Sequence, residues 1–224
     1  KRLASICHTR PSGAFFGLAQ LSPFTRNSKA WKDLMALPSI EDRVNALRNE
    51  TTRAKLIAEG IEAGDMKNLA HMLHPFGIDS KPNLDFARQQ SLLQLAEAEG
   101  KDPVEVYVER LLASEGREFF NFWMFGGNLD NQWKYMQLPH VVPMLGDAGA
   151  HVGFFTDTDS PTVLLSELTR EQGVYSLPEA VHRITGKSAA IIGLKERGEL
   201  REGWHADINV IDYENLSTCH PEYV

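Results

Sequence analysis

The fold is decided by a short apolar run that leads into an acid-bearing loop, Val141-Val142-Pro143-Met144-Leu145-Gly146-Asp147-Ala148-Gly149-Ala150-His151. A brief apolar run bounded by glycine is typical of a buried β-strand, and the small residues after it indicate a loop. Asp147 therefore stands at the carboxyl end of a predicted strand. In barrels of parallel strands and helices, that end of the strand carries the catalytic side chains. Asp147 and the nearby imidazole of His151 are thus the first candidates for chemistry.

The composition indicates a globular protein with few possible classes of partner. The chain has 224 residues, of which 42% are hydrophobic and 24% charged, enough to build a sizeable core. Its formal charge of −7 and its dispersed cationic residues provide no basic surface for nucleic acid. No apolar stretch approaches the roughly 20 residues that span a bilayer, so we expect no membrane partner. The two cysteines, Cys7 and Cys219, are too few for a disulfide framework and favour a cytoplasmic location.

Periodic apolar residues predict several helices. One signal is local and specific: in Asp102-Pro103-Val104-Glu105 an N-cap residue is followed by Pro at the first helical position and Glu at the third. The other predicted helical regions are Ile40–Leu73, Asp85–Glu99 ending at Gly100, a helix that starts at Ser160-Pro161, and Ser176–Leu194.

Strands are predicted at both ends of the chain. Leu3–Cys7 is the first, and the chain begins within it without Met, so we expect a piece of a longer protein. Ala206–Asp212 alternates as a strand with one buried face. Residues 8–18 and the aromatic-rich stretch between Gly116 and Pro143 are interpreted as loops. Those aromatic side chains either pack against one another or line a pocket, and the first interpretation is the simpler.

A metal site requires more than one acid. Asp147 can coordinate a divalent cation and accept a proton from metal-bound water, but three or four ligands are normally needed. If the loop forms a helix, His151 lies on the same helix face as Asp147. His8 stands at the end of the first predicted strand. On spacing alone, a solvated turn acid, a loop histidine at His151 and a strand-end histidine without a metal at His8 are the simpler interpretation. His71 and His74 fit a favourable interaction with a helix end.

Several segments resemble the amidohydrolase superfamily, in the branch of the D-aminoacylases, which are N-acyl-D-amino-acid deacylases. Val142–His151 resembles the last barrel strand of that superfamily, and Ser176–Leu194 resembles its final barrel helix. Arg197–Asp212 is similar to the turn and strand by which these chains return to a small β-sandwich domain. Arg10–Leu18 resembles a stretch that precedes the last barrel strand in members of this branch.

The resemblance implies an α/β fold, namely the helix-rich C-terminal part of a metal-dependent-hydrolase barrel of the TIM type. Residues 1–196 would supply the last barrel strands and helices, with a helical insertion at about 40–115, and residues 197–224 the short returning β-strand of the small β-sandwich domain. A full barrel needs about 250 residues. The family's His-x-His strand and its other ligand-bearing strands have no match here. We therefore expect the C-terminal portion of a longer enzyme, inactive alone and prone to self-association.

The function implied by the resemblance is zinc-dependent hydrolysis of the C–N bond of a small-molecule amide, as in N-acyl-D-amino-acid deacylases. In the family the last-strand Asp activates water, so Asp147 would be both a metal ligand and the catalytic base. The alternative is a non-catalytic amidohydrolase-fold scaffold or assembly protein.

Substrate contacts are less direct to assign. D-aminoacylases hold the substrate carboxylate partly with an Arg soon after the last-strand Asp, but Val152–Thr169 contains no Arg or Lys. Asp157 and Asp159 stand there instead and would repel a carboxylate. Either Arg10, at the end of the preceding strand, takes the place of that Arg, or the substrate carries no carboxylate. Arg10 and His151 are the expected substrate-binding residues.

Overall fold

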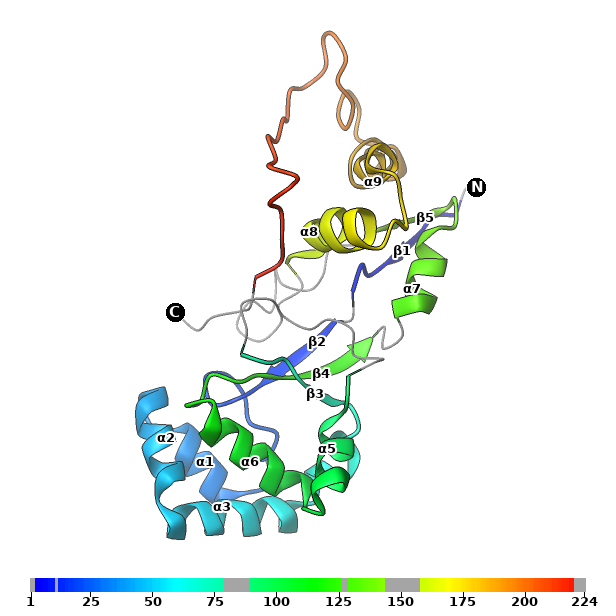
Figure 1. The fold of residues 1–224 in the computed structure, drawn as a ribbon. Coiled ribbons are helices and arrows are strands. Elements are labelled where there is room, and N and C mark those ends of the chain that lie inside the picture. The colour runs from blue at the N-terminus through cyan, green and yellow to red at the C-terminus, as the bar shows by residue number, and fades with distance from the viewer. Residues whose placement is uncertain (1–2, 11, 79–88, 126–128, 144–157, 220–224) are drawn as a thin grey trace.

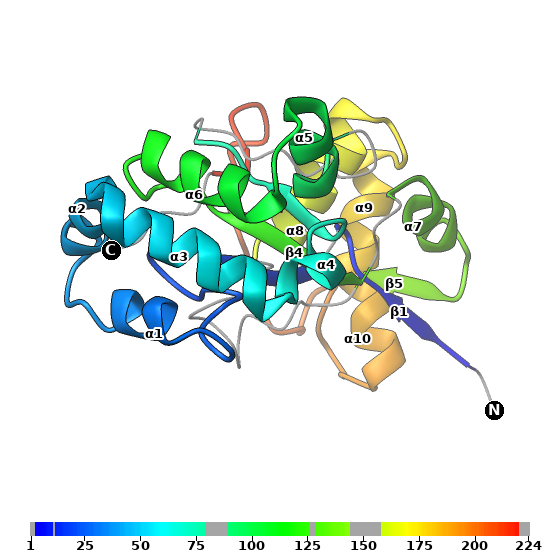
Figure 2. The same ribbon diagram turned by 90° about the horizontal axis from the view of Figure 1, so that it is seen from below.

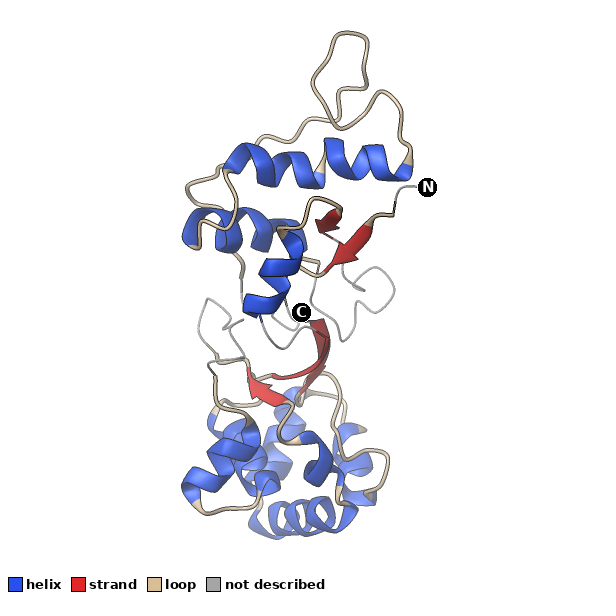
Figure 3. Cartoon of the chain, turned by 90° about the vertical axis from the view of Figure 1, so that its right-hand side faces the viewer, coloured by secondary structure: helices blue, strands red, loops and turns tan. Residues whose placement is uncertain are grey.

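The computed structural model describes residues 3–10, 12–78, 89–125, 129–143 and 158–219. Within these ranges the chain forms two lobes (Figure 1), and helices predominate in both (Figure 3). The chain places its first strand in one lobe, which we call the second lobe. It then builds the other, which we call the helical lobe, and returns to the second lobe for the remaining elements. The helical lobe comprises β2 (Ser12–Phe16), α1 (Lys29–Met35), α2 (Ile40–Arg48), α3 (Glu50–Ala63), α4 (Asp65–Leu69), β3 (Leu73–Pro75), α5 (Leu92–Glu99), α6 (Pro103–Ala113) and β4 (Phe120–Phe125).

The second lobe is built on a pair of parallel strands. It comprises β1 (Ser5–Cys7), α7 (Leu129–Met136), β5 (Val141–Pro143), α8 (Ser160–Val163), the π-helix η2 (Leu164–Glu171), α9 (Leu177–Ile184) and α10 (Gly186–Ile192). In the pair, Ser5 lies opposite Val141 and Cys7 lies opposite Pro143. The two strands lie side by side in Figure 2 as well. Both predicted strands are therefore confirmed over these residues, and their carboxyl ends meet at one edge.

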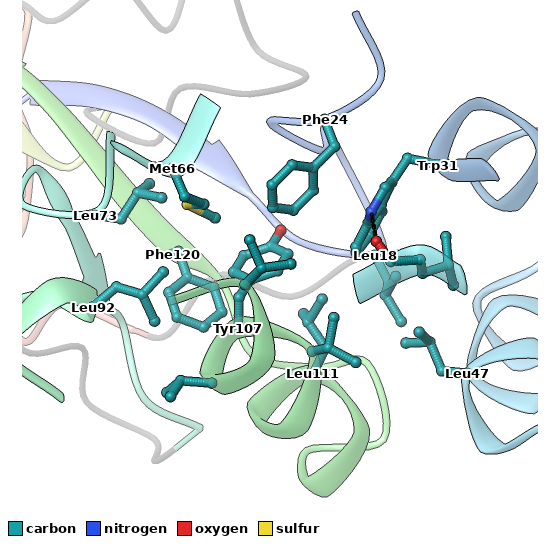
Figure 4. Close-up of a cluster of buried hydrophobic side chains, with 14 of the residues drawn as sticks. Leu18, Phe24, Trp31, Leu47, Met66, Leu73, Leu92, Tyr107, Leu111 and Phe120 are labelled. Carbon is teal, nitrogen blue, oxygen red and sulfur yellow. Dashed lines mark hydrogen bonds between the residues drawn. The ribbon is translucent and has the colours of Figure 1, made fainter. Parts of the chain in front are cut away.

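The helical lobe packs its helices on one face of a three-stranded antiparallel sheet in the order β2-β4-β3. Phe120 of β4 contributes to this core, and its ring centroid lies 4.6 Å from that of Tyr107 on α6. Trp31 is fully buried, and its indole N–H donates to the carbonyl oxygen of Leu56 at 2.9 Å (Figure 4). The aromatic core thus joins α1, α3 and α6 to the sheet.

Local capping explains where most helices begin and end. The predicted capping box of α6 is confirmed, because the Asp102 side chain accepts from a first-turn N–H and Glu105 accepts from the Asp102 N–H. Ser91 and Gln94 form a second box at the start of α5. Gly64 adopts a left-handed conformation with φ of 73° and ends α3.

The structure divides two of the long predicted helical regions. Ile40–Leu73 contains α2, α3 and α4, with breaks at Asn49 and Gly64, and its last residue begins β3. The helix predicted over Asp85–Glu99 begins at Leu92, because Ser91 caps it. Ser176–Leu194 is divided into α9 and α10 at Thr185, whose backbone is not helical. In each case a local cap or a non-helical backbone angle sets where the helix begins or ends, although the spacing of apolar residues alone predicts a longer helix.

Three predictions about strands and loops were wrong. The stretch 8–18 contains strand β2, and the aromatic stretch 116–143 contains strand β4 and helix α7. Conversely, Ala206–Asp212 forms no strand, although its sequence alternates. A strand exists through hydrogen bonds to a neighbour, and this segment pairs with no strand in the described part of the chain. Its apolar side chains remain exposed, Ile208 at 63% and Val210 at 98%.

The second lobe has its own smaller apolar core. It is formed by Met136 of α7, residues of α8 and η2, and Tyr175, with Cys7 of β1 packed against it. Among the described residues, no helix combines the length and the apolar character needed to cross a membrane.

Candidate functional site

The carboxyl edge of the β1–β5 pair is where the sequence predicts the site. Beyond Cys7 the chain continues through His8, Thr9 and Arg10. Beyond Pro143 it enters residues 144–157, which carry Asp147 and His151 and lie outside the described residues. The roles predicted for Asp147 and His151 therefore stay predictions.

The described chain resumes beside the end of β1. Arg10 Nε donates to Asp159 Oδ1 at 2.7 Å, and the side chains of the two residues are 4% and 26% exposed. Next to this ion pair, the hydroxyls of Thr9 and Ser160 share a hydrogen bond of 2.7 Å and are buried. Of the three predicted site residues, the structure thus describes Arg10 alone, and it places Arg10 against an acid of its own chain.

The Arg10–Asp159 pair reverses one expectation. The sequence suggests that Asp159 repels an anionic substrate, whereas in the structure its carboxylate compensates the buried guanidinium. A buried charge that lost its partner would be strongly unfavourable, so each residue stabilises the other in place. Sequence reasoning missed the pair because 149 residues separate the partners, and no local pattern reports a contact over that distance.

Burial also changes the acidity of groups close behind the strand edge. Burial raises the pKa of the Cys7 thiol at the end of β1. Burial likewise raises the pKa of Tyr175 to about 12, although the nearby Arg183 cation opposes the shift. Both groups therefore stay protonated near neutral pH, and neither is a ready nucleophile or base there.

The helical lobe contributes a second polar feature, on its sheet. His74 on β3 lies opposite Asn121 on β4, and Asn121 lies opposite Phe15 on β2, so the three share a row across the sheet. Side chains alternate along a strand, so this row faces away from the helical core that holds Phe120. Burial lowers the pKa of His74, which keeps the imidazole neutral. The prediction that His74 stands at a helix end was wrong, because the chain has already become β3 there.

The described residues do not by themselves form a metal site. In the parts of the chain that the structure describes, no three His, Cys, Asp or Glu side chains gather closely enough to hold a metal ion. The described side chains at the strand edge include a guanidinium, two hydroxyls and a carboxylate bound to that guanidinium. This set does not match the three or four ligands that zinc requires.

Comparisons with known proteins identify the family. The model of the amidohydrolase family matches residues 16–224. Over 56 residues, or 25% of this chain, the sequence is 46% identical to an N-acyl-D-aspartate deacylase of Alcaligenes xylosoxydans xylosoxydans, and the match covers 11% of that relative.

Two solved structures give weaker likenesses. An N-acyl-D-glutamate deacylase of Bordetella bronchiseptica, complexed with zinc and a phosphonate inhibitor, matches at a TM-score of 0.39 and 20% identity over 76% of this chain and 38% of its own. A D-aminoacylase matches at a TM-score of 0.33 and 15% identity over 70% of this chain and 42% of its own. The matches therefore span less than half the length of these relatives. The match of the family model over most of the sequence confirms the predicted resemblance: this chain belongs to the amidohydrolase family.

Proposed function

We propose that the protein containing this chain is a metal-dependent hydrolase that cleaves the C–N bond of small-molecule amides, as an N-acyl-D-amino-acid deacylase does. Membership of the amidohydrolase family supports the reaction class. The 46% identity to an N-acyl-D-aspartate deacylase supports the substrate class. In the same proposal, residues 1–196 form the last part of a (β/α) barrel, and residues 197–224 lead to a small β-sandwich domain.

One structural observation supports a location for the proposed active site, namely the parallel pairing of β1 with β5. Parallel strands end at a common edge, and in barrels of this class that edge holds the catalytic side chains. Asp147 follows the end of β5 by four residues. Asp159, which follows Asp147 in the sequence, contacts Arg10 next to the end of β1.

In the proposed reaction, Asp147 accepts a proton from the water that attacks the amide carbonyl. A carboxylate can do so when it is ionised and within hydrogen-bond reach of the water. Asp147 is also the proposed zinc ligand and His151 a proposed substrate contact, with the remaining ligands outside the described residues. Bound zinc would lower the pKa of water towards neutrality and polarise the carbonyl.

The test is made on the complete protein loaded with zinc, with N-acetyl-D-aspartate and N-acetyl-D-glutamate as substrates. The wild type should release acetate, and Asp147→Asn should lower kcat at least about a hundredfold, the usual contribution of a general base. Asp130→Asn, on an exposed position of α7, is the matched control and should retain its activity. Full activity of the Asp147 variant would disprove its role. A wild type that binds zinc but cleaves no amide would favour the non-catalytic scaffold.

A further inference from the structure

A small cavity opens in the helical lobe between α3, α4, α5 and the start of α6, with a volume of about 190 Å³. We call it the α3–α6 cavity. Figure 1 shows the helices of this lobe on the side of the sheet that is turned away from the second lobe, so the cavity lies apart from the edge of β1 and β5. Its lining is mainly apolar but includes two charged residues. The lining residues that matter here are Ile61, Met66, Lys67, Leu93, Asp102 and Val104.

The size of the α3–α6 cavity limits what it can hold. A cavity of about 150 Å³ holds benzene, whereas pockets for drug-sized ligands begin at about 300 Å³. At about 190 Å³, the α3–α6 cavity therefore suits a molecule only slightly larger than benzene. Met66 and Val104 are 3% and 1% exposed and belong to the core of the helical lobe. The apolar wall of the cavity is thus continuous with packed structure.

Two opposite charges line the α3–α6 cavity without pairing. Lys67 on α4 is exposed, and Asp102, which precedes α6, is partly buried. In the described part of the chain, neither forms an ion pair with the other or with a third residue. Asp102 Oδ1 accepts from the Val104 N–H at 2.8 Å, so the cap of α6 holds this carboxylate in place. A ligand with an apolar body and both charges complements such a cavity.

We propose that the α3–α6 cavity binds a free α-amino acid with an aliphatic side chain of the size of leucine. Its carboxylate pairs with Lys67, its ammonium pairs with Asp102, and its side chain packs against Leu93. A ligand with one charge leaves either the lysine or the aspartate uncompensated. The inference does not rest on the proposed function, because the cavity and the edge of β1 and β5 belong to different lobes.

The test uses the complete protein and three ligands that share one apolar body. L-leucine carries both charges, 4-methylpentanoate keeps only the carboxylate, and 3-methylbutylamine keeps only the ammonium. The L enantiomer is chosen because it is not a product of the proposed reaction. Saturation-transfer NMR titrations should give a Kd on the order of 1 mM for L-leucine. Each ligand with one charge should bind at least about fivefold more weakly, since it lacks one ion pair near the surface.

Two substitutions separate the roles of the charges. Lys67→Met should weaken L-leucine and 4-methylpentanoate at least about fivefold and leave 3-methylbutylamine unchanged. Asp102→Asn should weaken L-leucine and 3-methylbutylamine instead, and it preserves the helix cap because Asn caps as well as Asp does. Lys32→Met is the matched control, since Lys32 is also exposed but lies on α1 outside the cavity, and it should change no Kd.

A third substitution fills the α3–α6 cavity. Leu93→Trp adds volume to its wall and should abolish the binding of all three ligands. Urea unfolding checks that each variant is folded, and the two charge variants decide the test if Leu93→Trp is not.

Several results would overturn the proposal. One is no binding of L-leucine at about 20 mM, a concentration well above the expected Kd. Another is an equal Kd for the three ligands, and a third is unchanged L-leucine binding in both charge variants. If Asp147→Asn loses L-leucine binding and Lys67→Met keeps it, the amino acid occupies the proposed active site and the cavity does not bind it. None of these measurements depends on amide hydrolysis, so a failure of the proposed function leaves the test intact.

Discussion

Arg183 Nη1 donates a hydrogen bond to the carbonyl oxygen of Val141 at 3.1 Å and thereby ties helix α9 to the first residue of β5. The same guanidinium donates to the carbonyl oxygens of Met136 and Gln137 at the end of α7. It also lies over the ring of Tyr175, with 4.6 Å between Arg183 Cζ and the ring centroid. One buried side chain thus satisfies several carbonyls where the chain enters β5.

Replacing Arg183 by Met should therefore lower the free energy of unfolding by about 2–4 kcal/mol, because the carbonyls of Met136 and Gln137 would lose the Arg183 donor. The carbonyl of Val141 would keep the Lys187 ammonium as a donor at 2.9 Å. Urea unfolding followed by circular dichroism measures the change. The control is Arg197→Gln, which removes the exposed ion pair with Asp207 and should change stability by no more than about 0.5 kcal/mol. Equal losses of unfolding free energy in the two variants would show that the buried hydrogen bonds of Arg183 contribute no more to stability than the exposed ion pair does.

How far the sequence predicts this structure depends on how local each signal is. The start of α6 was predicted to the residue, because Asp102, Pro103 and Glu105 specify a helix start within one turn. The strands that became β1 and β5 were also predicted from short apolar runs. Their parallel pairing follows from the family resemblance, since the family places its last strands side by side.

Features that depend on distant partners were not predictable in this way. The alternation of Ala206–Asp212 suggests a strand, but a strand requires a neighbour, and none lies beside it among the described residues. The ion pair of Arg10 with Asp159 has no local sequence signal either. Asp147 and His151 lie outside the described residues, so their assignment rests on family resemblance and on the strand edge that precedes them.

Gly60 lies on the inner face of α3, where the helix approaches its neighbours closely. A Cβ at this position would lie 2.8 Å from Val104 Cγ1 and 3.3 Å from Trp31 Nε1. Alanine favours a helix over glycine by about 1 kcal/mol, but overpacking a core typically costs about 1–3 kcal/mol. We expect Gly60→Ala to destabilise the protein by about 1 kcal/mol net, measured by urea unfolding. The control is Thr51→Ala, at an exposed position of the same helix, which should change the free energy of unfolding by no more than about 0.5 kcal/mol. If Gly60→Ala made the protein more stable, the close packing around Gly60 would be contradicted.

Glu59 links the pH to the stability of the helical lobe. The backbone N–H of Ala30 and the hydroxyl of Ser28 each donate to its carboxylate at 2.8 Å. These hydrogen bonds lower the pKa of Glu59 below its ordinary value of 4.5. A depressed pKa stabilises the fold above the ordinary value, and that contribution is lost as the pH falls through the folded-state pKa. Urea midpoints of the wild type and Glu59→Gln should therefore differ most near neutrality and converge in acid. A difference independent of pH would contradict this assignment.

The two cysteines should differ in reactivity, which tests how closely the end of β1 is packed. Burial raises the pKa of the Cys7 thiol, so less thiolate is present at a given pH, whereas Cys219 is exposed. Because the thiolate is the nucleophile, iodoacetamide at pH 8 should modify Cys219 at least about ten times faster than Cys7. Mass spectrometry of tryptic peptides follows both sites, and Cys219→Ser isolates the slow reaction of Cys7. If Cys7 already reacts as fast as Cys219 in the wild type, the end of β1 is open to solvent and the packing described here is wrong.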